Sequence, residues 1–230
     1  NLGQLVNQII WIKEHTKNKV ILVTSAAITC GSEKLNIIPK NTREKQAAAA
    51  IGQLELLKNY SHFFEAKGYK IAQVLLTRDN LISEKYKQNI TNTLNTLLSH
   101  NVIPIINEND TISTDEITFG DNDLLSALVS KTMAASTLVL LTDQRGVFNT
   151  NPNEDPHATL IPNITNISQE FINKMPGSTN PRSKGGMKSK LMAAKKATES
   201  GVSVYIAFGR SETVLIDYIN GIISGTIIST

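Results

Sequence analysis

The stretch NVIPIINEND, residues 101–110, joins an apolar run, VIPII, directly to amide and carboxylate side chains. A run that is apolar at successive positions, rather than at alternate ones, is typical of a strand buried on both faces. Residues 137–142, TLVLLT, and residues 202–208, VSVYIAF, have the same character. Such strands occur where helices cover both sides of a parallel sheet, so these runs predict an α/β fold.

Helical periodicity fills the segments between these strands. Residues 2–15, LGQLVNQIIWIKEH, repeat apolar side chains at helical spacing, and KVILVTS, residues 19–25, then predicts a strand. The alternation predicts a three-layer αβα sandwich with a mainly parallel central sheet. We expect a single domain over residues 1–230, with two lobes, rather than two independent domains. The other expected elements are a helix over 43–67, a strand over 70–77, a helix over 89–100, a strand over 102–107, a helix over 124–136, a loop with room for a hairpin over 147–167, and a helix over 185–201.

Composition excludes several classes of protein. The net charge is +3, from 23 basic and 20 acidic residues mixed along the chain, and aromatic residues make up only 5%, so no surface suited to nucleic acid is expected. Cys30 is the single cysteine, which excludes an internal disulfide framework and favours a cytoplasmic location. No apolar run approaches the about 20 residues of a membrane span, and the first residues lack a signal-peptide pattern.

Polar residues follow each of four predicted strands. Ser25 follows the first, Asn107 follows VIPII, Thr142 and Asp143 follow TLVLL, and Gly209 follows VSVYIAF. Turn and capping preferences explain any one of these strand ends. Four ends with different chemistries favour a shared ligand cleft, because ligands of open α/β sheets bind beyond the carboxyl ends of the strands.

The stretch SKGGMKSK, residues 183–190, is a candidate phosphate-binding segment. Its glycines let the backbone approach an anion, the helix that follows presents free N–H groups, and Lys184, Lys188 and Lys190 add positive charge. The alternative is a loop followed by a solvated helix face. No P-loop, G-x-G-x-x-G or G-x-S-x-G motif occurs in the chain. Beside the acidic and amide cluster over 106–123, which could hold magnesium and an ammonium group, the segment indicates phosphoryl transfer.

Several motifs together resemble a known family. VILVTSAAI, INEND with FGDND at this spacing, LLTDQRGVF and GGMKSK occur in this order and resemble the glutamate 5-kinase branch of the amino-acid kinase family. The resemblance runs over nearly the whole chain. It implies the amino-acid kinase fold and the ATP-dependent phosphorylation of the γ-carboxyl of L-glutamate to L-glutamyl 5-phosphate, the first step of proline biosynthesis.

The resemblance also implies roles for individual residues. Asp110 and Asp121 would attract the substrate ammonium, while amides and hydroxyls would bind its α-carboxylate. Lys190 would steady the transferring phosphoryl group, and Asp123 would orient the catalytic lysines. The implied substrate-binding residues are Ser25, Asn107, Asp110, Asp121 and Asn122, and the implied ATP-binding residues are Thr142, Asp143, Lys184, Gly185, Gly186, Met187, Lys188, Ser189 and Lys190.

The implied cofactors and partners follow the same resemblance. They are ATP and Mg²⁺, the latter held mainly by the ATP phosphates without an assigned protein ligand. A homo-oligomer, dimer or tetramer, and feedback inhibition by proline at or overlapping the glutamate site are further implied. The small and apolar stretch QAAAAIGQLELL, residues 46–57, fits either a core or a dimer interface, and we expect a core.

The chain departs from the family pattern in three ways. The family begins with a strand and a K-x-G-[ST] turn that carries a phosphate-binding lysine; neither is in this sequence, and we expect them to precede residue 1 in the protein. A chain without that strand would be of doubtful activity. Ala26 and Lys184 stand where many members have Gly and Thr. Many bacterial members carry a C-terminal PUA domain after the kinase domain, whereas we expect this protein to be a single-domain form.

Two other functions are open. Acetylglutamate kinase shares the fold, but its substrate lacks the free ammonium, so Asp110 and Asp121 count against it. A ligand-sensing module without catalysis is the alternative from another class. Lys190, Asp123 and Asp143 count against that, since a sensor has no need of phosphoryl-transfer groups.

Overall fold

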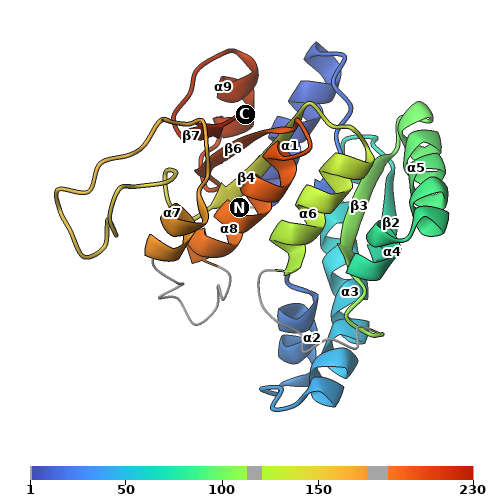
Figure 1. Cartoon of the computed structure of the whole chain (residues 1–230). Helices are drawn as coiled ribbons and strands as arrows, with labels where there is room; N and C mark the ends of the chain where they lie inside the picture. The colour runs from blue at the N-terminus through green and yellow to red at the C-terminus, as the bar shows by residue number, and fades with distance from the viewer. Residues whose placement is uncertain (1, 113–120, 176–185, 230) are drawn as a thin grey trace. The chain divides into compact units, whose positions relative to one another are not determined.

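The computed structural model describes residues 2–112, 121–175 and 186–229. They belong to two compact units, Leu2–Thr118 and Phe119–Thr230, which we call the N-terminal and the C-terminal unit. Figure 1 shows the helices and strands of both. Each unit is described by itself, and the single domain expected over residues 1–230 stays a prediction.

The N-terminal unit contains a three-stranded parallel sheet in the order β1-β3-β2. The central strand, β3, is buried at all six of its positions, as a strand covered on both faces must be. Helix α3 packs against β2, and helix α5 packs against β3. The elements are α1 (Leu2–His15), β1 (Leu22–Val23), α2 (Ala27–Leu35), α3 (Thr42–Glu65), β2 (Ile71–Leu76), α4 (Arg78–Ile82), α5 (Glu84–Ser99) and β3 (Ile103–Glu108).

The C-terminal unit contains a four-stranded sheet in the order β4-β6-β7-β5. The pairs β4–β6 and β5–β7 are parallel, and β6–β7 is antiparallel. Helices α6 and α8 pack on each other, with α6 against β4 and α8 against β6 (Figure 1). The elements are α6 (Asp121–Thr132), β4 (Thr137–Thr142), β5 (Asn163–Ile164), α7 (Gln169–Lys174), α8 (Gly186–Thr198), β6 (Ser203–Phe208), α9 (Val214–Ile219) and β7 (Thr226–Ile228).

The predicted α/β class with mainly parallel strand pairing is confirmed. The helix over 2–15 and the strand over 137–142 have the predicted bounds, and the loop over 147–167 folds back through an antiparallel bridge between Phe148 and Leu160. The strand expected over 19–25 is short, because its pairing with β3 covers only Leu22 and Val23. Helices α2, α4, α7 and α9 were not predicted, since so few turns give no measurable periodicity.

Two glycines let α2 and α3 approach each other to backbone contact. A Cβ atom on Gly52 would lie 1.7 Å from the carbonyl oxygen of Ala27, and one on Gly31 would lie 1.7 Å from that of Ala48. Ala48 and Ala49 are fully buried, which confirms the core interpretation of residues 46–57 for this face of α3, whereas Ile51 and Leu54 of the same stretch are exposed. The small residues of the stretch therefore set the position of α2.

The residue before α2, Ala26, has a left-handed backbone conformation with φ 84° and ψ 7°. This conformation costs an L-residue with a side chain roughly 1–2 kcal/mol, whereas glycine adopts it freely. We predict that Ala26→Gly raises the free energy of unfolding by about 1 kcal/mol or less, because glycine also loses more entropy on folding. Urea unfolding measures the change.

The neighbouring alanine supplies the control for this prediction. Ala27 is buried in the first turn of α2, where glycine costs about 1 kcal/mol relative to alanine. The two substitutions should therefore shift stability in opposite directions. Equal losses in both variants would show that the backbone at Ala26 is not strained.

Candidate functional site

Three strands of the N-terminal unit end side by side and carry the first group of candidate residues. Val23 lies opposite Ile106, and the backbone N–H of Thr24 donates to the carbonyl oxygen of Ile106 at 2.9 Å. Leu75 lies opposite Asn107 on the other side of β3. Ser25, which is exposed, therefore follows β1 at the sheet edge where β3 ends with Asn107 and Glu108. The expected gathering of these two strand ends is confirmed.

Asn107 is 2% exposed, and its amide is held from two sides. Its Nδ2 donates to Oε1 of Gln53 at 3.1 Å, and its Oδ1 accepts from the backbone N–H of Glu108 at 3.0 Å. An asparagine amide has two N–H donors and two lone pairs, so these bonds use half of each. Asp110, two residues beyond the strand, is half-buried. The strand end thus presents a fixed amide followed by a carboxylate.

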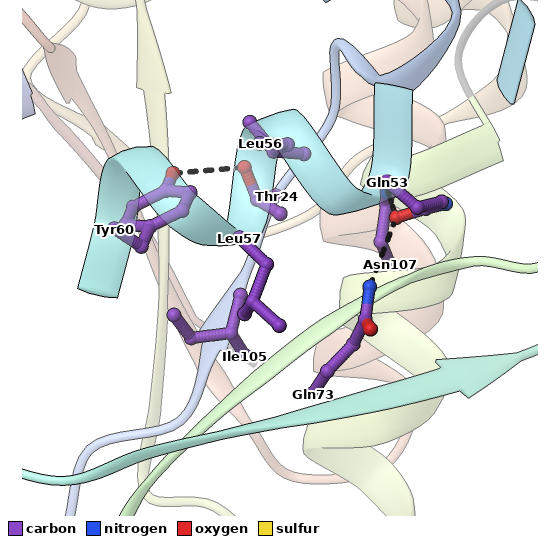
Figure 2. A pocket seen from close by; sticks show the side chains of 8 residues that line it. All are labelled: Thr24, Gln53, Leu56, Leu57, Tyr60, Gln73, Ile105 and Asn107. Atoms are coloured by element: carbon purple, nitrogen blue, oxygen red, sulfur yellow. Dashed lines mark hydrogen bonds between the residues drawn. The ribbon is translucent and has the colours of Figure 1, made fainter. Parts of the chain in front are cut away.

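A small pocket lies beneath this strand end, with room for about one water molecule. Figure 2 shows the side chains around it and the hydrogen bond of 2.8 Å between Thr24 Oγ1 and the Tyr60 hydroxyl. Burial raises the pKa of the Tyr60 phenol above its ordinary value. The pocket is lined by Thr24, Gln53, Leu56, Leu57, Tyr60, Gln73, Ile105 and Asn107.

In the C-terminal unit, the start of α8 meets the start of α6 through charged and polar side chains. Lys190 Nζ lies 2.9 Å from Asp123 Oδ1, and Ser189 Oγ donates to Asp123 Oδ2 at 2.9 Å. The side chains of Lys190 and Asp123 are only 17% and 18% exposed. Both carboxylate oxygens of Asp123 are thus engaged, and the lysine is held in one position near the helix N-terminus.

The other candidates at this helix start fall partly within the described residues. Gly186 begins α8 with φ 58°, a conformation that favours glycine. Met187 is buried in the core and Lys188 is exposed. Lys184 and Gly185 lie outside the described residues, as does the side chain of Asp121, while Asn122 is half-buried in the first turn of α6.

Thr142 is the last residue of β4 in the same unit, and Asp143 follows it. The Thr142 carbonyl accepts from the N–H of Gly209 at 2.7 Å, which joins the ends of β4 and β6, and its hydroxyl donates to Asp143 at 3.3 Å. Asp143 is exposed. The strand ends expected to share an edge, those after TLVLL and VSVYIAF, are therefore adjacent.

Thr226 is a residue of this region that the sequence did not single out. It is fully buried in β7, where its Oγ1 accepts from the N–H of Val147 at 2.8 Å and donates to the carbonyl of Ile161 at 2.6 Å. A Cβ on Gly146 would lie 2.7 Å from the same oxygen. Thr226 thus fixes the segment after Asp143. No local sequence pattern predicts this role, because Thr226 is far from Val147 in the sequence.

The described residues contain neither a cluster of metal ligands nor a membrane-spanning helix. The parts of the chain that the structure describes hold no group of three or more His, Cys, Asp or Glu side chains arranged as metal ligands. None of the described helices has both the length and the apolar character of a membrane span.

The model of the amino acid kinase family matches residues 2–207 of the chain. The chain belongs to the amino acid kinase family. Among solved structures, it is similar to isopentenyl phosphate kinase of T. acidophilum, with a TM-score of 0.64 and 16% sequence identity over 99% of this chain and 89% of that one. At this identity the likeness concerns the fold.

Curated relatives narrow the resemblance within the family. The chain is 44% identical over 214 residues to the glutamate 5-kinase of Clostridium perfringens, a match that covers 90% of this chain and 80% of the relative. It is 44% identical over 228 residues to that of Geobacter sulfurreducens, covering 98% of this chain and 61% of the relative. Against the glutamate 5-kinase of Citrifermentans bemidjiense it spans 57% of the relative's length. The resemblance to glutamate 5-kinases is confirmed.

Proposed function

We propose that the protein catalyses ATP-dependent phosphorylation of the γ-carboxyl of L-glutamate, which yields L-glutamyl 5-phosphate for proline biosynthesis. The observation that carries the proposal is the Lys190–Asp123–Ser189 cluster at the start of α8. It holds an ammonium group near a helix N-terminus, where phosphate charge is stabilised. Relatives named glutamate 5-kinase at 40–44% identity support the choice of acceptor.

The reaction needs no general base, because the γ-carboxylate is already ionised at neutral pH. A carboxylate oxygen attacks the γ-phosphorus of ATP, the new O–P bond forms, and the bond from the γ-phosphorus to the bridging oxygen breaks, so that ADP leaves with the electron pair. Catalysis then consists of positioning and charge compensation. Lys190 is the proposed catalytic residue, since its Nζ would bind the transferring phosphoryl group.

Asp123 is the second proposed catalytic-site residue, and it acts through Lys190. Both of its carboxylate oxygens are taken by Lys190 and Ser189, a donor set that fits an orienting role better than direct metal ligation. Mg²⁺ would be held mainly by the ATP phosphates, as this ion usually is in kinases, and when bound it neutralises phosphate charge.

The nucleotide would contact the C-terminal unit. At the end of β4, Thr142 is half-buried and Asp143 is exposed. Both side chains are therefore accessible to a bound nucleotide. Helix α8 would supply backbone N–H groups to the phosphates. The proposed ATP-binding residues remain Thr142, Asp143, Lys184, Gly185, Gly186, Met187, Lys188, Ser189 and Lys190.

Glutamate would contact the strand ends of the N-terminal unit. Ser25 and Asn107 offer a hydroxyl and an amide for the α-carboxylate, and Asp110 offers a carboxylate for the ammonium. Asp121 and Asn122 are proposed as further substrate contacts. The acidic groups disfavour an N-acetylated substrate, whose nitrogen carries no charge.

ADP release by the full-length gene product with MgATP tests the proposal. L-Glutamate and N-acetyl-L-glutamate are compared as acceptors, and proline is added to a parallel sample. Turnover with glutamate alone is expected. Turnover with N-acetyl-L-glutamate alone would indicate an acetylglutamate kinase. No turnover with either acceptor would favour the ligand-sensing module.

Three further properties belong to the same proposal. We expect proline to inhibit turnover at or overlapping the glutamate site, the protein to form a homo-oligomer, dimer or tetramer, and its location to be the cytoplasm. The proline arm of the assay tests the first. Light scattering by the purified full-length protein tests the second.

A further inference from the structure

Gln53 lies in the middle of α3, in an otherwise apolar stretch, and is only 7% exposed. Its Nε2 donates to the backbone carbonyl of Glu108 at 3.0 Å, and its Oε1 accepts from Asn107 Nδ2 at 3.1 Å. The same Oε1 also accepts from Gln73 Nε2 on β2 at 3.4 Å. The amide of Gln53 thus contacts two consecutive residues at the end of β3 and one residue of the neighbouring strand. Figure 2 shows the bond to Asn107 beside the small pocket.

Gly52, the residue before Gln53, fixes the segment that follows β1. The backbone of Gly52 lies against the carbonyl of Ala27 and the N–H of Gly31, so α2 begins directly on this turn of α3. Ser25 is two residues before α2. One turn of α3 therefore fixes the segments that carry Ser25 and Asn107.

We propose that Gln53 is a positioning residue for glutamate, which acts by holding the Asn107 amide and the carboxyl end of β3 in the geometry that binds the substrate. The inference rests on the proposed function, since it assumes that Asn107 contacts glutamate. Without Gln53, the Nδ2 of Asn107 loses its buried acceptor and the Glu108 carbonyl loses a donor. The amide is then no longer preorganised, and binding must order it.

The effect should be specific to one substrate. The groups proposed for ATP lie in the C-terminal unit, whereas all bonds of Gln53 described above lie within the N-terminal unit. A loss of preorganisation at Asn107 should therefore raise the KM for glutamate and leave the KM for ATP unchanged. A purely structural role for Gln53 would lower stability without this difference.

Gln53→Met tests the proposal, because methionine keeps the length of the side chain and removes both hydrogen-bonding groups. We expect the KM for L-glutamate to rise about tenfold, the factor that one well-formed hydrogen bond corresponds to, and the KM for ATP to stay within about twofold. Steady-state kinetics of the full-length gene product with MgATP measures both.

Leu94→Ala is the control for stability alone. Leu94 is fully buried on α5 of the same unit, so its truncation lowers the melting temperature, and it takes no part in the hydrogen bonds of Gln53 and Asn107 described above. Its two KM values should stay those of the wild type. An equal rise in both KM values of Gln53→Met, or a rise in the glutamate KM of the control as large as that of Gln53→Met, would overturn the proposal.

Hydrogen exchange separates this inference from the proposed function. The N–H of Glu108 donates to Asn107 Oδ1, and that of Asn109 donates to the carbonyl of Leu76. Both should exchange faster in Gln53→Met than in Leu94→Ala at matched stability. If the wild type fails to phosphorylate glutamate, the proposed function fails, while faster exchange confined to this strand end still supports positioning by Gln53. Unchanged exchange would refute it.

Discussion

Replacing Lys190 with alanine is expected to lower kcat for glutamate phosphorylation by about a hundredfold or more, the usual loss when one preorganised donor to a developing charge is removed. The KM for glutamate should change little, because the ammonium of Lys190 is proposed to bind the transferring phosphoryl group rather than the amino acid. Steady-state kinetics with saturating MgATP measures both quantities. An equal loss in kcat and in glutamate affinity would mean that Lys190 only builds the site.

Loss of the lysine also leaves a carboxylate behind. Asp123 is 18% exposed and would keep, among the described residues, its bond from Ser189, so some loss of stability accompanies the loss of activity. Asp123→Asn separates the two effects, since it removes the ion pair and leaves the ammonium. Turnover should fall less in Asp123→Asn than in Lys190→Ala at a comparable melting temperature.

A second lysine of α8 provides the matched control for charge and helix propensity. Lys196 is half exposed, and its nearest acidic partner is Glu199 at 4.0 Å, an exposed pair of little energetic weight. Lys196→Ala should leave kcat and stability unchanged. A drop in kcat for this variant similar to that of Lys190→Ala would assign the effect to the net charge of the helix.

Gly52→Ala is expected to destabilise the N-terminal unit by about 3 kcal/mol or more, at the upper end of what overpacking costs. The added Cβ would lie 1.7 Å from the carbonyl oxygen of Ala27 and 2.6 Å from the backbone nitrogen of Gly31. These are backbone atoms, so no side-chain rotation relieves the clash and α2 must move away from α3. Urea unfolding followed by circular dichroism measures the loss.

Gly68 is the glycine to compare with it. Unlike Gly52, it has a positive φ, 78°, and a Cβ there would meet no atom within 4 Å. Gly68→Ala should therefore cost only the strain of a left-handed alanine, roughly 1–2 kcal/mol. Gly52→Ala and Gly68→Ala with equal losses would show that α2 and α3 are not in backbone contact.

The hydrophobic pattern alone determined the fold class. The run before Asn107 and the run TLVLLT are apolar at successive positions, and a strand of this kind has to be covered on both faces. Strand ends that carry polar residues then had to lie at one sheet edge, which is why Ser25 and Asn107 could be placed together from sequence. The order of the motifs was also sufficient to identify the family.

The residues that hold these strand ends in place became apparent only in the tertiary structure. Gln53 stands in an apolar helical stretch with no motif around it, and its bonds reach a strand 54 and 55 positions later in the chain. Thr226 acts on Val147 over 79 positions. Such pairs have no local signal, because only the packing of distant elements brings the two partners within hydrogen-bonding distance.

For Ala26 and Lys190, the sequence predicted part of the result and the tertiary structure supplied the rest. The sequence placed an alanine at a turn where glycine is common in the family, but the cost depends on φ, and only the fold of the chain around α2 sets φ to 84°. Likewise, the motif around Lys190 gave a lysine near a helix start, while the pairing with Asp123 across 67 positions fixes where its ammonium lies. The residue types and their order were in the sequence; their positions arise from long-range packing, which a local pattern does not encode.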